Sequence, residues 1–197
     1  FAQDGGRTLP VLCHSMPRFN YKGQGSVKVM LYKGTLETPV GPAQLIAEDN
    51  YIIRCDFYQG GLDDCQRFLK KYFPDQPFVE GFNDELIKGL VQLDEYFSGT
   101  RKSFDLNVKL YGTPFYGKVW SELCKIPYGE LVSYKTLTER CGAGKGFRAV
   151  GQANHNNPIS VIVPCHRVVG ADGKLTGYGS GLEVKRFLID LEQKNRS

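Results

Sequence analysis

The segment "VSYKTLTERCGAGKGFRAVGQANHNNP" (residues 132–158) sets two short helical stretches on either side of a run of glycines. Ser133 is a favoured N-cap residue and predicts the start of the first helix, and Gly142 predicts its end. The second predicted helix, 147–157, stops before Pro158 because proline disfavours a helical residue ahead of it. Two short helices across a glycine turn are typical of a helix-turn-helix, although many helical hairpins share the pattern.

The second of these helices carries small residues at Ala149, Gly151 and Ala153. Glycine inside a helix costs about 1 kcal/mol relative to alanine, so its presence calls for a reason. Small side chains permit close packing on another helix, and they equally permit close approach to a DNA groove. Arg148 lies in the first turn, where the helix dipole disfavours a cation. It is either a solvated surface residue or a side chain inserted into DNA, and the residues alone leave both questions open.

A cysteine and a histidine stand together in "VIVPCHRVVG" (161–170), after an apolar run, 159–163, that predicts a buried strand. Cys165 is a poor nucleophile near neutral pH unless a base accepts its proton, and His166 is the adjacent candidate. Neighbouring side chains on a regular strand point to opposite faces. Contact therefore requires a bend after Pro164 or a bridging water. A buried cysteine with a purely structural role is the alternative.

A general base also needs a third group that fixes its tautomer. The last predicted helix begins near Leu182, after a glycine-rich loop at 170–181, and it carries two carboxylates. Either Glu192 or Asp190 is expected to orient His166.

The first half of the chain mixes strands and helices. The patterns predict an antiparallel meander of strands 26–33, 43–48 and 51–57 with a turn at 37–42, helices 62–73 and 83–97, and an edge strand 104–110. Residues 1–25 are interpreted as a flexible N-terminal extension. The predicted class is α+β, with a small N-terminal α+β domain (26–110) and a mostly helical C-terminal winged-helix or helix-turn-helix domain (111–197).

Composition narrows the class of protein. With 41% hydrophobic and 23% charged residues, the chain is typical of a globular protein. No apolar run approaches the roughly 18 residues of a membrane span, so no membrane partner is expected. Residues 114–197 hold 12 of the 25 Lys and Arg but only 7 of the 21 Asp and Glu. A basic half attracts phosphates, although a solvated surface is the plainer interpretation.

The cysteines and histidines do not predict a metal site. Six cysteines occur without a Cys-x-x-Cys pair, which favours free thiols in a reducing compartment. Cys13 and His14 are adjacent but isolated, and His155 and His166 complete no ligand set with them.

Several motifs together resemble one family. "PCHRV" (164–168), preceded by "RAVG" (148–151) and Asn157–Pro158, is similar to the O6-alkylguanine-DNA alkyltransferases, the methylated-DNA–protein-cysteine methyltransferases that repair alkylated guanine. "IPYGELVSY" (126–134) and "TGYGSGLEVKRFLIDLE" (176–192) extend the likeness over most of residues 110–192. The motifs in this order are highly specific, whereas the first half is only compatible.

The resemblance implies a direct repair reaction without a cofactor. The protein would flip a damaged base out of the duplex and keep its alkyl group on Cys165, once and irreversibly. His166 would take the thiol proton through a water, with Glu192 orienting the imidazole and Asn157 bracing the turn. Tyr134 would donate a proton to the leaving guanine and help to swing the nucleotide out.

The resemblance also implies how substrate and DNA are held. Backbone carbonyls of Cys165 and Val168 would read the exocyclic amine, while Tyr178 and the amide of Gly179 would line the alkyl side. Arg148 would fill the vacated base stack. The residues expected at the minor groove are Arg148, Ala149, Gly151, Ala153 and Tyr134. The implied partner is double-stranded DNA containing O6-alkylguanine, and O4-alkylthymine would be a poorer substrate. The protein would act as a monomer inside the cell. Its location would be the nucleus in a eukaryote or the cytoplasm in a prokaryote.

Two departures and two rival functions accompany this interpretation. Many relatives have serine at Gly179, so the preference among bulky alkyl groups stays open. Some animal relatives bind zinc in the N-terminal domain. The comparable positions in this chain are Glu48 and Ile53, which offer no matching ligand set, so no metal is expected. A lesion-binding adaptor without transfer activity is one rival, and a cysteine hydrolase that turns over repeatedly is the other.

Overall fold

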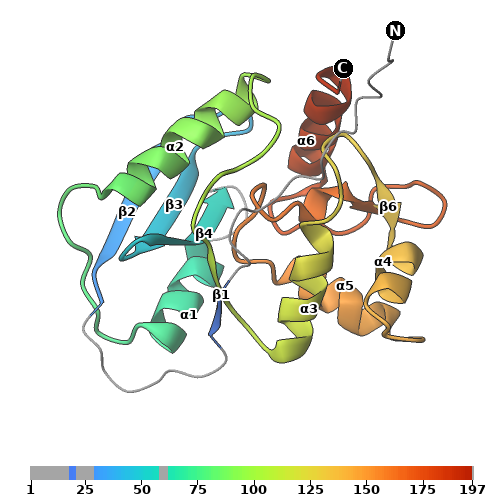
Figure 1. Cartoon of the computed structure of the whole chain (residues 1–197), viewed down its shortest axis with the longest axis horizontal. Coiled ribbons are helices and arrows are strands. Elements are labelled where there is room, and N and C mark those ends of the chain that lie inside the picture. Colours follow the sequence, from blue (N-terminus) through green and yellow to red (C-terminus); the bar gives the residue numbers. More distant parts are fainter. Residues whose placement is uncertain (1–17, 21–28, 58–61, 197) are drawn as a thin grey trace, which may run out of the picture.

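The structure, a computed structural model, describes residues 18–20, 29–57 and 62–196. An antiparallel sheet in the order β2–β3–β4 forms the centre of the first half (Figure 1). Its strands are β2 (Leu31–Leu36), β3 (Ala43–Glu48) and β4 (Tyr51–Phe57). The predicted meander is confirmed. Its first strand begins at Leu31 instead of residue 26, and residues 26–28 lie outside the described part.

Helices cover both faces of this sheet. The faces differ because alternate side chains of a strand point to opposite sides, so Leu45 and Ile46 of β3 enter different clusters. Leu45 packs in the cluster that includes Leu86 and Leu93 of α2 (Asp84–Phe97). Ile46 packs with residues of α1 (Leu62–Tyr72). The sequence predicted both helices to within one residue at each end.

A second, two-stranded sheet pairs segments far apart in the chain. β1 (Arg18–Asn20) runs parallel to β5 (Lys109–Tyr111). The edge strand predicted at 104–110 is thus reduced to its last residues, because residues 104–108 carry only one isolated bridge, from Val108 to Ile52 of β4. β1 itself was not foreseen within the predicted flexible extension. The rest of residues 1–25 lies outside the described part.

The second half is mostly helical. It contains α3 (Pro114–Leu123), α4 (Tyr134–Arg140), α5 (Phe147–His155) and α6 (Leu182–Lys194). The Ser133 hydroxyl accepts the backbone N–H of Thr136, as the predicted N-cap requires, and Gly142 takes a φ of 58° just after α4. α5 ends two residues before the predicted end. The helix pair α4–α5 packs on α3 (Figure 1), and the α+β class is confirmed.

The buried strand predicted at 159–163 is wrong. The segment is buried but turns, with only isolated bridges from Ile159 to Cys55 and from Ser160 to Val163. Val161 has a φ of 72°, outside the range of a strand. An apolar run indicates that a segment is buried. This segment is buried, but it does not pair with a continuous partner strand.

One hydrophobic cluster spans both halves of the chain. It contains Leu45 and Leu93 from the first half and Leu123 and Leu188 from the second. The division into domains at residue 110 therefore stays a prediction. Within the described ranges, no helix has the length and apolar character needed to cross a membrane.

Candidate active site

Cys165 begins a single turn of 3-10 helix, η1 (Cys165–Arg167), directly after Pro164. The backbone N–H of Arg167 donates to the carbonyl of Pro164 at 3.1 Å and closes the turn. The backbone therefore bends where the sequence predicted a bend. The cysteine is buried, with 4% of its surface exposed, yet it lines a cavity.

Asn157 holds the cysteine and its turn together. Its Nδ2 donates to the carbonyl of Val163 at 2.8 Å and to Sγ of Cys165 at 3.1 Å, while its Oδ1 accepts the N–H of Ile159 at 3.1 Å. Burial raises the pKa of Cys165, although the Asn157 hydrogen bond and the charge of Lys185 oppose this. The resting group is a thiol, so its proton must leave during any reaction.

His166 is completely buried and presents two different nitrogens. Nε2 faces Oε1 of Glu192 at 2.8 Å, which assigns the ring hydrogen to Nε2. Nδ1 has no hydrogen-bond partner among the described residues, and no hydrogen bond there joins it to Cys165. Burial lowers the pKa of His166 despite the nearby Glu192 carboxylate. The imidazole is therefore neutral, with Nδ1 available as a base.

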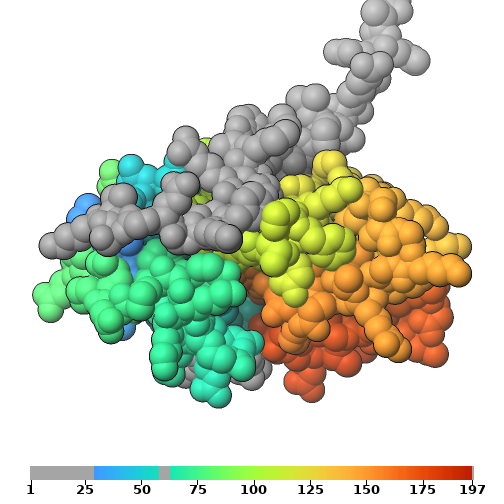
Figure 2. All heavy atoms as spheres, turned by 90° about the horizontal axis from the view of Figure 1, so that it is seen from below, coloured from blue at the N-terminus to red at the C-terminus, as the bar shows by residue number. Residues whose placement is uncertain are grey.

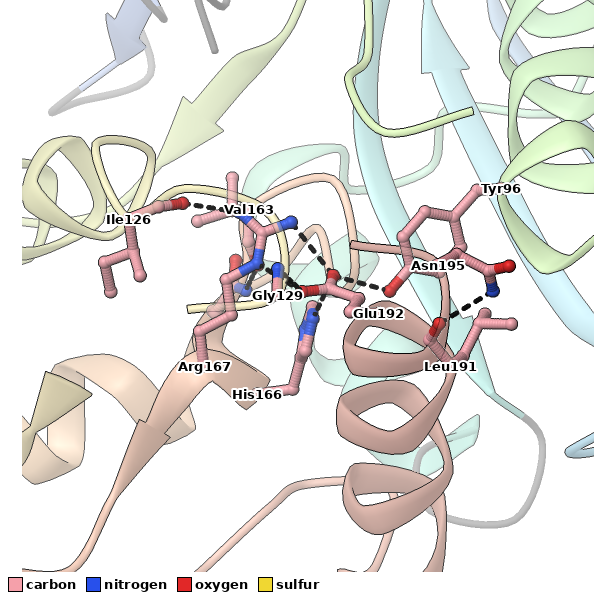
Figure 3. A network of polar contacts seen from close by, with 10 residues as sticks. Tyr96, Ile126, Gly129, Val163, His166, Arg167, Leu191, Glu192 and Asn195 are labelled. Carbon is pink, nitrogen blue, oxygen red and sulfur yellow. Dashed lines mark hydrogen bonds and ion pairs between the residues drawn. The ribbon is translucent and has the colours of Figure 1, made fainter. Parts of the chain in front are cut away.

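Glu192 is the centre of a buried network (Figure 3). Besides His166, it accepts hydrogen bonds from Tyr96 Oη at 2.8 Å, from the N–H of Gly129 at 2.9 Å, and from Nε and Nη2 of Arg167, both at 2.9 Å. Burial alone would raise the pKa of Glu192, but His166 and Arg167 hold it well below its usual range.

The structure therefore decides between the two carboxylates expected on the last helix. Glu192 meets His166, whereas Asp190 is exposed. Sequence reasoning missed Tyr96 and Arg167. Tyr96 gave no signal because it lies 96 positions away on α2. Arg167 follows His166 directly and could have been suspected as a partner for the same carboxylate.

The cavity beside Cys165 is small. It has a volume of about 40 Å³ and is lined by Arg54, Asp56, Phe57, Asp64, Asn154, His155, Asn157, Ser160, Cys165 and residues 177–180. Tyr178 and Gly179, expected on the alkyl side, do border it. Residues 177–180, which form one wall of this cavity, belong to a segment without regular structure.

The two other residues expected near the base lie around this cavity without lining it. The hydroxyl of Tyr134, at the start of α4, accepts a hydrogen bond from Nδ2 of Asn154 at 3.1 Å. The carbonyl of Val168 accepts one from Nζ of Lys185 at 2.6 Å. Lys185 also donates to the carbonyl of Thr176 at 2.7 Å, and burial lowers its pKa to about 8. Sequence reasoning missed this lysine, although it lies between the apolar positions of α6.

α5 presents most of the predicted DNA-binding residues to solvent. Arg148 and Ala149 are exposed and Gly151 is half-buried. A Cβ added at Gly151 would meet no atom of another part of the described chain within 4 Å, so close helix packing does not explain this glycine. Ala153 differs, because it is fully buried and its carbonyl accepts a hydrogen bond from Trp120 Nε1 at 2.8 Å. Its side chain packs inside the protein and is not available to DNA.

An open groove of about 460 Å³ adjoins α5. α1, α3 and α5 meet on this face of the molecule (Figure 2). Its lining includes Lys71 of α1, His155 of α5, and Arg67 of α1 with its ion-pair partner Asp64. The groove shares His155 and Asn157 with the cavity at Cys165, so the two hollows are neighbours.

The described residues hold no group of three or more His, Cys, Asp or Glu side chains arranged for a metal ion. Glu48 instead bonds to Nζ of Lys109 at 2.6 Å and to the hydroxyl of Tyr111. Cys13 and His14 lie outside the described residues.

Comparison with protein families gives two matches that together span most of the chain. Residues 31–110 match the ribonuclease-like domain of 6-O-methylguanine DNA methyltransferase, and residues 114–194 match the DNA-binding domain of the same protein.

Individual relatives agree along nearly their whole lengths. The methylated-DNA–protein-cysteine methyltransferase of Methanosarcina barkeri is 42% identical over 166 residues, covering 84% of this chain and 99% of its own. The constitutive enzyme of that name from Bacillus subtilis is 41% identical over 165 residues, covering 83% and 96%. The crystal structure of the Mycobacterium tuberculosis O6-methylguanine methyltransferase has a TM-score of 0.71 at 37% identity, covering 84% and 94%. A crystal structure of the M. tuberculosis OGT in complex with DNA has a TM-score of 0.70 at 37% identity, covering 83% and 94%.

Proposed function

The chain belongs to the 6-O-methylguanine DNA methyltransferase family, and we propose that it repairs double-stranded DNA by transferring an alkyl group from O6 of guanine to Cys165. The family match confirms the resemblance seen in "PCHRV" and its neighbouring motifs. O4-alkylthymine is a poorer substrate in this proposal. The observation that carries it is the buried series Cys165, His166 and Glu192 beside a cavity.

The reaction is a displacement at carbon. Sγ of Cys165 forms a bond to the alkyl carbon while the bond from that carbon to O6 breaks. The thiol proton passes through a water to Nδ1 of His166, whose Nε2 hydrogen is held by Glu192. Tyr134 donates a proton to the leaving guanine ring and is reprotonated from the base network, so that thiol and alkylguanine become thioether and guanine. Asn157 keeps Sγ in place.

The product explains why each molecule acts once. A thioether is stable, and the proposed step regenerates no thiol. The thiol is itself the reagent, so the transfer uses no cofactor. The backbone carbonyls of Cys165 and Val168 receive the exocyclic amine, and Tyr178 and the amide of Gly179 border the alkyl group.

DNA is contacted by α5 from the minor groove. A base inside a duplex cannot reach Cys165, so the nucleotide must be everted at a cost of a few kcal/mol. The exposed Arg148, with the small residues Ala149 and Gly151 beside it, suits insertion into the vacated stack, as side chains of minor-groove proteins do. Tyr134 assists the eversion.

A titration tests the function against its rivals. A duplex with one O6-methylguanine is incubated with increasing protein, and restored guanine is counted. Repair by transfer predicts a plateau at about one guanine per protein molecule. Continued turnover would indicate a hydrolase, and binding without restoration would indicate an adaptor. Cys165→Ala is expected to bind the duplex and restore none. In this proposal the protein acts on DNA as a monomer inside the cell.

A further inference from the structure

Asn154 is a polar residue that the proposed reaction does not use, although it lines the cavity at Cys165. It lies on α5 and only 3% of its surface is exposed. Its neighbour Ala153 is buried for packing, but an amide at the next position must find hydrogen-bond partners.

The orientation of this amide follows from its partners. Nδ2 donates to the hydroxyl of Tyr134 at 3.1 Å and to the carbonyl of Cys165 at 3.5 Å. A carbonyl oxygen can only accept, so the nitrogen and not the oxygen must face Cys165. The other end of the amide, Oδ1, is buried and has no hydrogen-bond partner among the described residues. A buried acceptor without a hydrogen bond costs free energy, and a ligand that supplies a donor removes this cost.

We propose that Asn154 is a specificity-determining residue, whose Oδ1 accepts a hydrogen bond from the exocyclic amino group of the everted purine. This inference rests on the proposed function. Alkylation at O6 leaves the guanine ring without a hydrogen on N1, so the 2-amino group is the only N–H donor of the damaged base in DNA. The Cys165 carbonyl, which accepts a hydrogen bond from Nδ2 of Asn154 at 3.5 Å, is also assigned to that amine, so the Asn154 amide lies next to a group that the proposal already places at the amino edge of the base.

The consequence is selection for guanine over purines without the amino group. A site built around a hydrogen bond to a substrate N–H rejects the analogue that lacks it, because the buried acceptor is then left unpaired. The amide thereby joins three functions: its nitrogen fixes the Tyr134 hydroxyl and the Cys165 backbone, and its oxygen reads the substrate.

The test compares two free bases, so that DNA binding does not enter. The second-order rate constant for alkylation of Cys165 is measured with O6-benzylguanine and with O6-benzylhypoxanthine, which lacks the amino group. The wild-type protein is expected to prefer the guanine. Asn154→Leu, which has a similar shape, is expected to reduce that preference about tenfold, mainly through slower reaction with the guanine. The matched control Asn156→Leu, at an exposed position outside the cavity, is expected to keep the wild-type ratio.

The outcomes separate the proposals. A wild-type protein that reacts with neither base contradicts the proposed function. A wild-type protein without preference, or an Asn154→Leu protein with the wild-type preference, overturns the role of Oδ1. Equal slowing with both bases also overturns it, since Asn154 would then act only through Tyr134. If circular dichroism shows that Asn154→Leu is unfolded, Asn154→Ala decides: it removes Oδ1 without adding bulk and is expected to reduce the preference likewise, and a folded Asn154→Ala protein with the wild-type preference overturns the role.

Discussion

At the scale of single residues, the charge on Glu192 is what organises the site. A carboxylate with 1% exposure is stable only when its oxygens are fully engaged, and here Arg167, His166, Tyr96 and the backbone of Gly129 engage them. The same contacts hold the hydrogen of His166 on Nε2 and leave Nδ1 free to act as a base.

Glu192→Gln is expected to lower the free energy of unfolding by about 3 kcal/mol, because it leaves Arg167 buried without its counter-charge. Urea unfolding at neutral pH measures this. Asp190→Asn, at an exposed position of the same helix, is the control and is expected to change little. A loss no larger in the Gln variant than in the control would contradict the proposed importance of this ion pair.

The stability of the wild-type protein should also depend on pH through Glu192. Its folded pKa lies well below the unfolded value of about 4.3, so the unfolded chain binds more protons in between. The stabilisation is complete above about pH 4.3 and is lost as the pH falls through the folded pKa. Urea midpoints recorded from pH 7 downward should therefore drop more steeply in the wild type than in Glu192→Gln, and parallel curves would argue against the shift.

At the scale of elements, local patterns predicted the helices well and the segment before Cys165, residues 159–163, poorly. α4 was predicted from its cap at Ser133 and its end at Gly142, both properties of neighbouring residues. The strand expected at 159–163 failed because strand formation depends on a partner, and β4 offers this segment only one bridge, at Cys55. The local sequence of residues 159–163 does not show with which strand, if any, they pair.

The same limit applies to the candidate site. Cys165, His166 and Glu192 could be predicted because a nucleophile, a base and a carboxylate have recognisable chemistry. Tyr96 and Lys185 could not, since their roles arise only when α2 and α6 pack beside η1. Their side chains carry no local signal of that packing.

α5 gives a prediction of its own. Arg148→Ala is expected to slow repair of duplex DNA by at least tenfold and to leave the reaction with free O6-benzylguanine nearly unchanged, because the inserted side chain matters only when a base stack must be refilled. Single-turnover rates with both substrates measure this, with exposed Arg186→Ala on α6 as the control. Equal losses on the two substrates would remove the role in base eversion.

The loop at 170–181 gives a further prediction. Lys185 ties it down by donating to the carbonyls of Thr176 and Val168. Lys185→Met keeps the length of the side chain but removes both bonds, so we expect faster amide hydrogen exchange across the loop and slower alkyl transfer, by about tenfold for a lost charged hydrogen bond. Exchange rates identical to those of the wild type would show that the loop is held by other contacts.

At the scale of the whole molecule, the two halves are joined by a shared core and by a polar contact. The main hydrophobic cluster takes residues from both, and Tyr96 of α2 reaches across to Glu192 of α6. The first half thus contributes to the orientation of His166, although it supplies neither the nucleophile nor the base.

A shared core predicts cooperative unfolding. We expect a single urea transition that is the same by fluorescence and by circular dichroism. Tyr96→Phe should lower the free energy of unfolding by about 1 kcal/mol, because one hydrogen bond among several to the same carboxylate is lost. Tyr116→Phe, at a partly exposed residue, should leave the free energy of unfolding unchanged. Two separated transitions would mean that the halves unfold independently.

The most direct test of alkyl transfer to Cys165 is peptide mass spectrometry of the protein after it has restored a duplex containing O6-methylguanine. We expect one methyl group in place of the thiol hydrogen, on the peptide that contains Cys165 and on no other cysteine peptide. Restored DNA together with an unmodified Cys165 would contradict alkyl transfer to this residue.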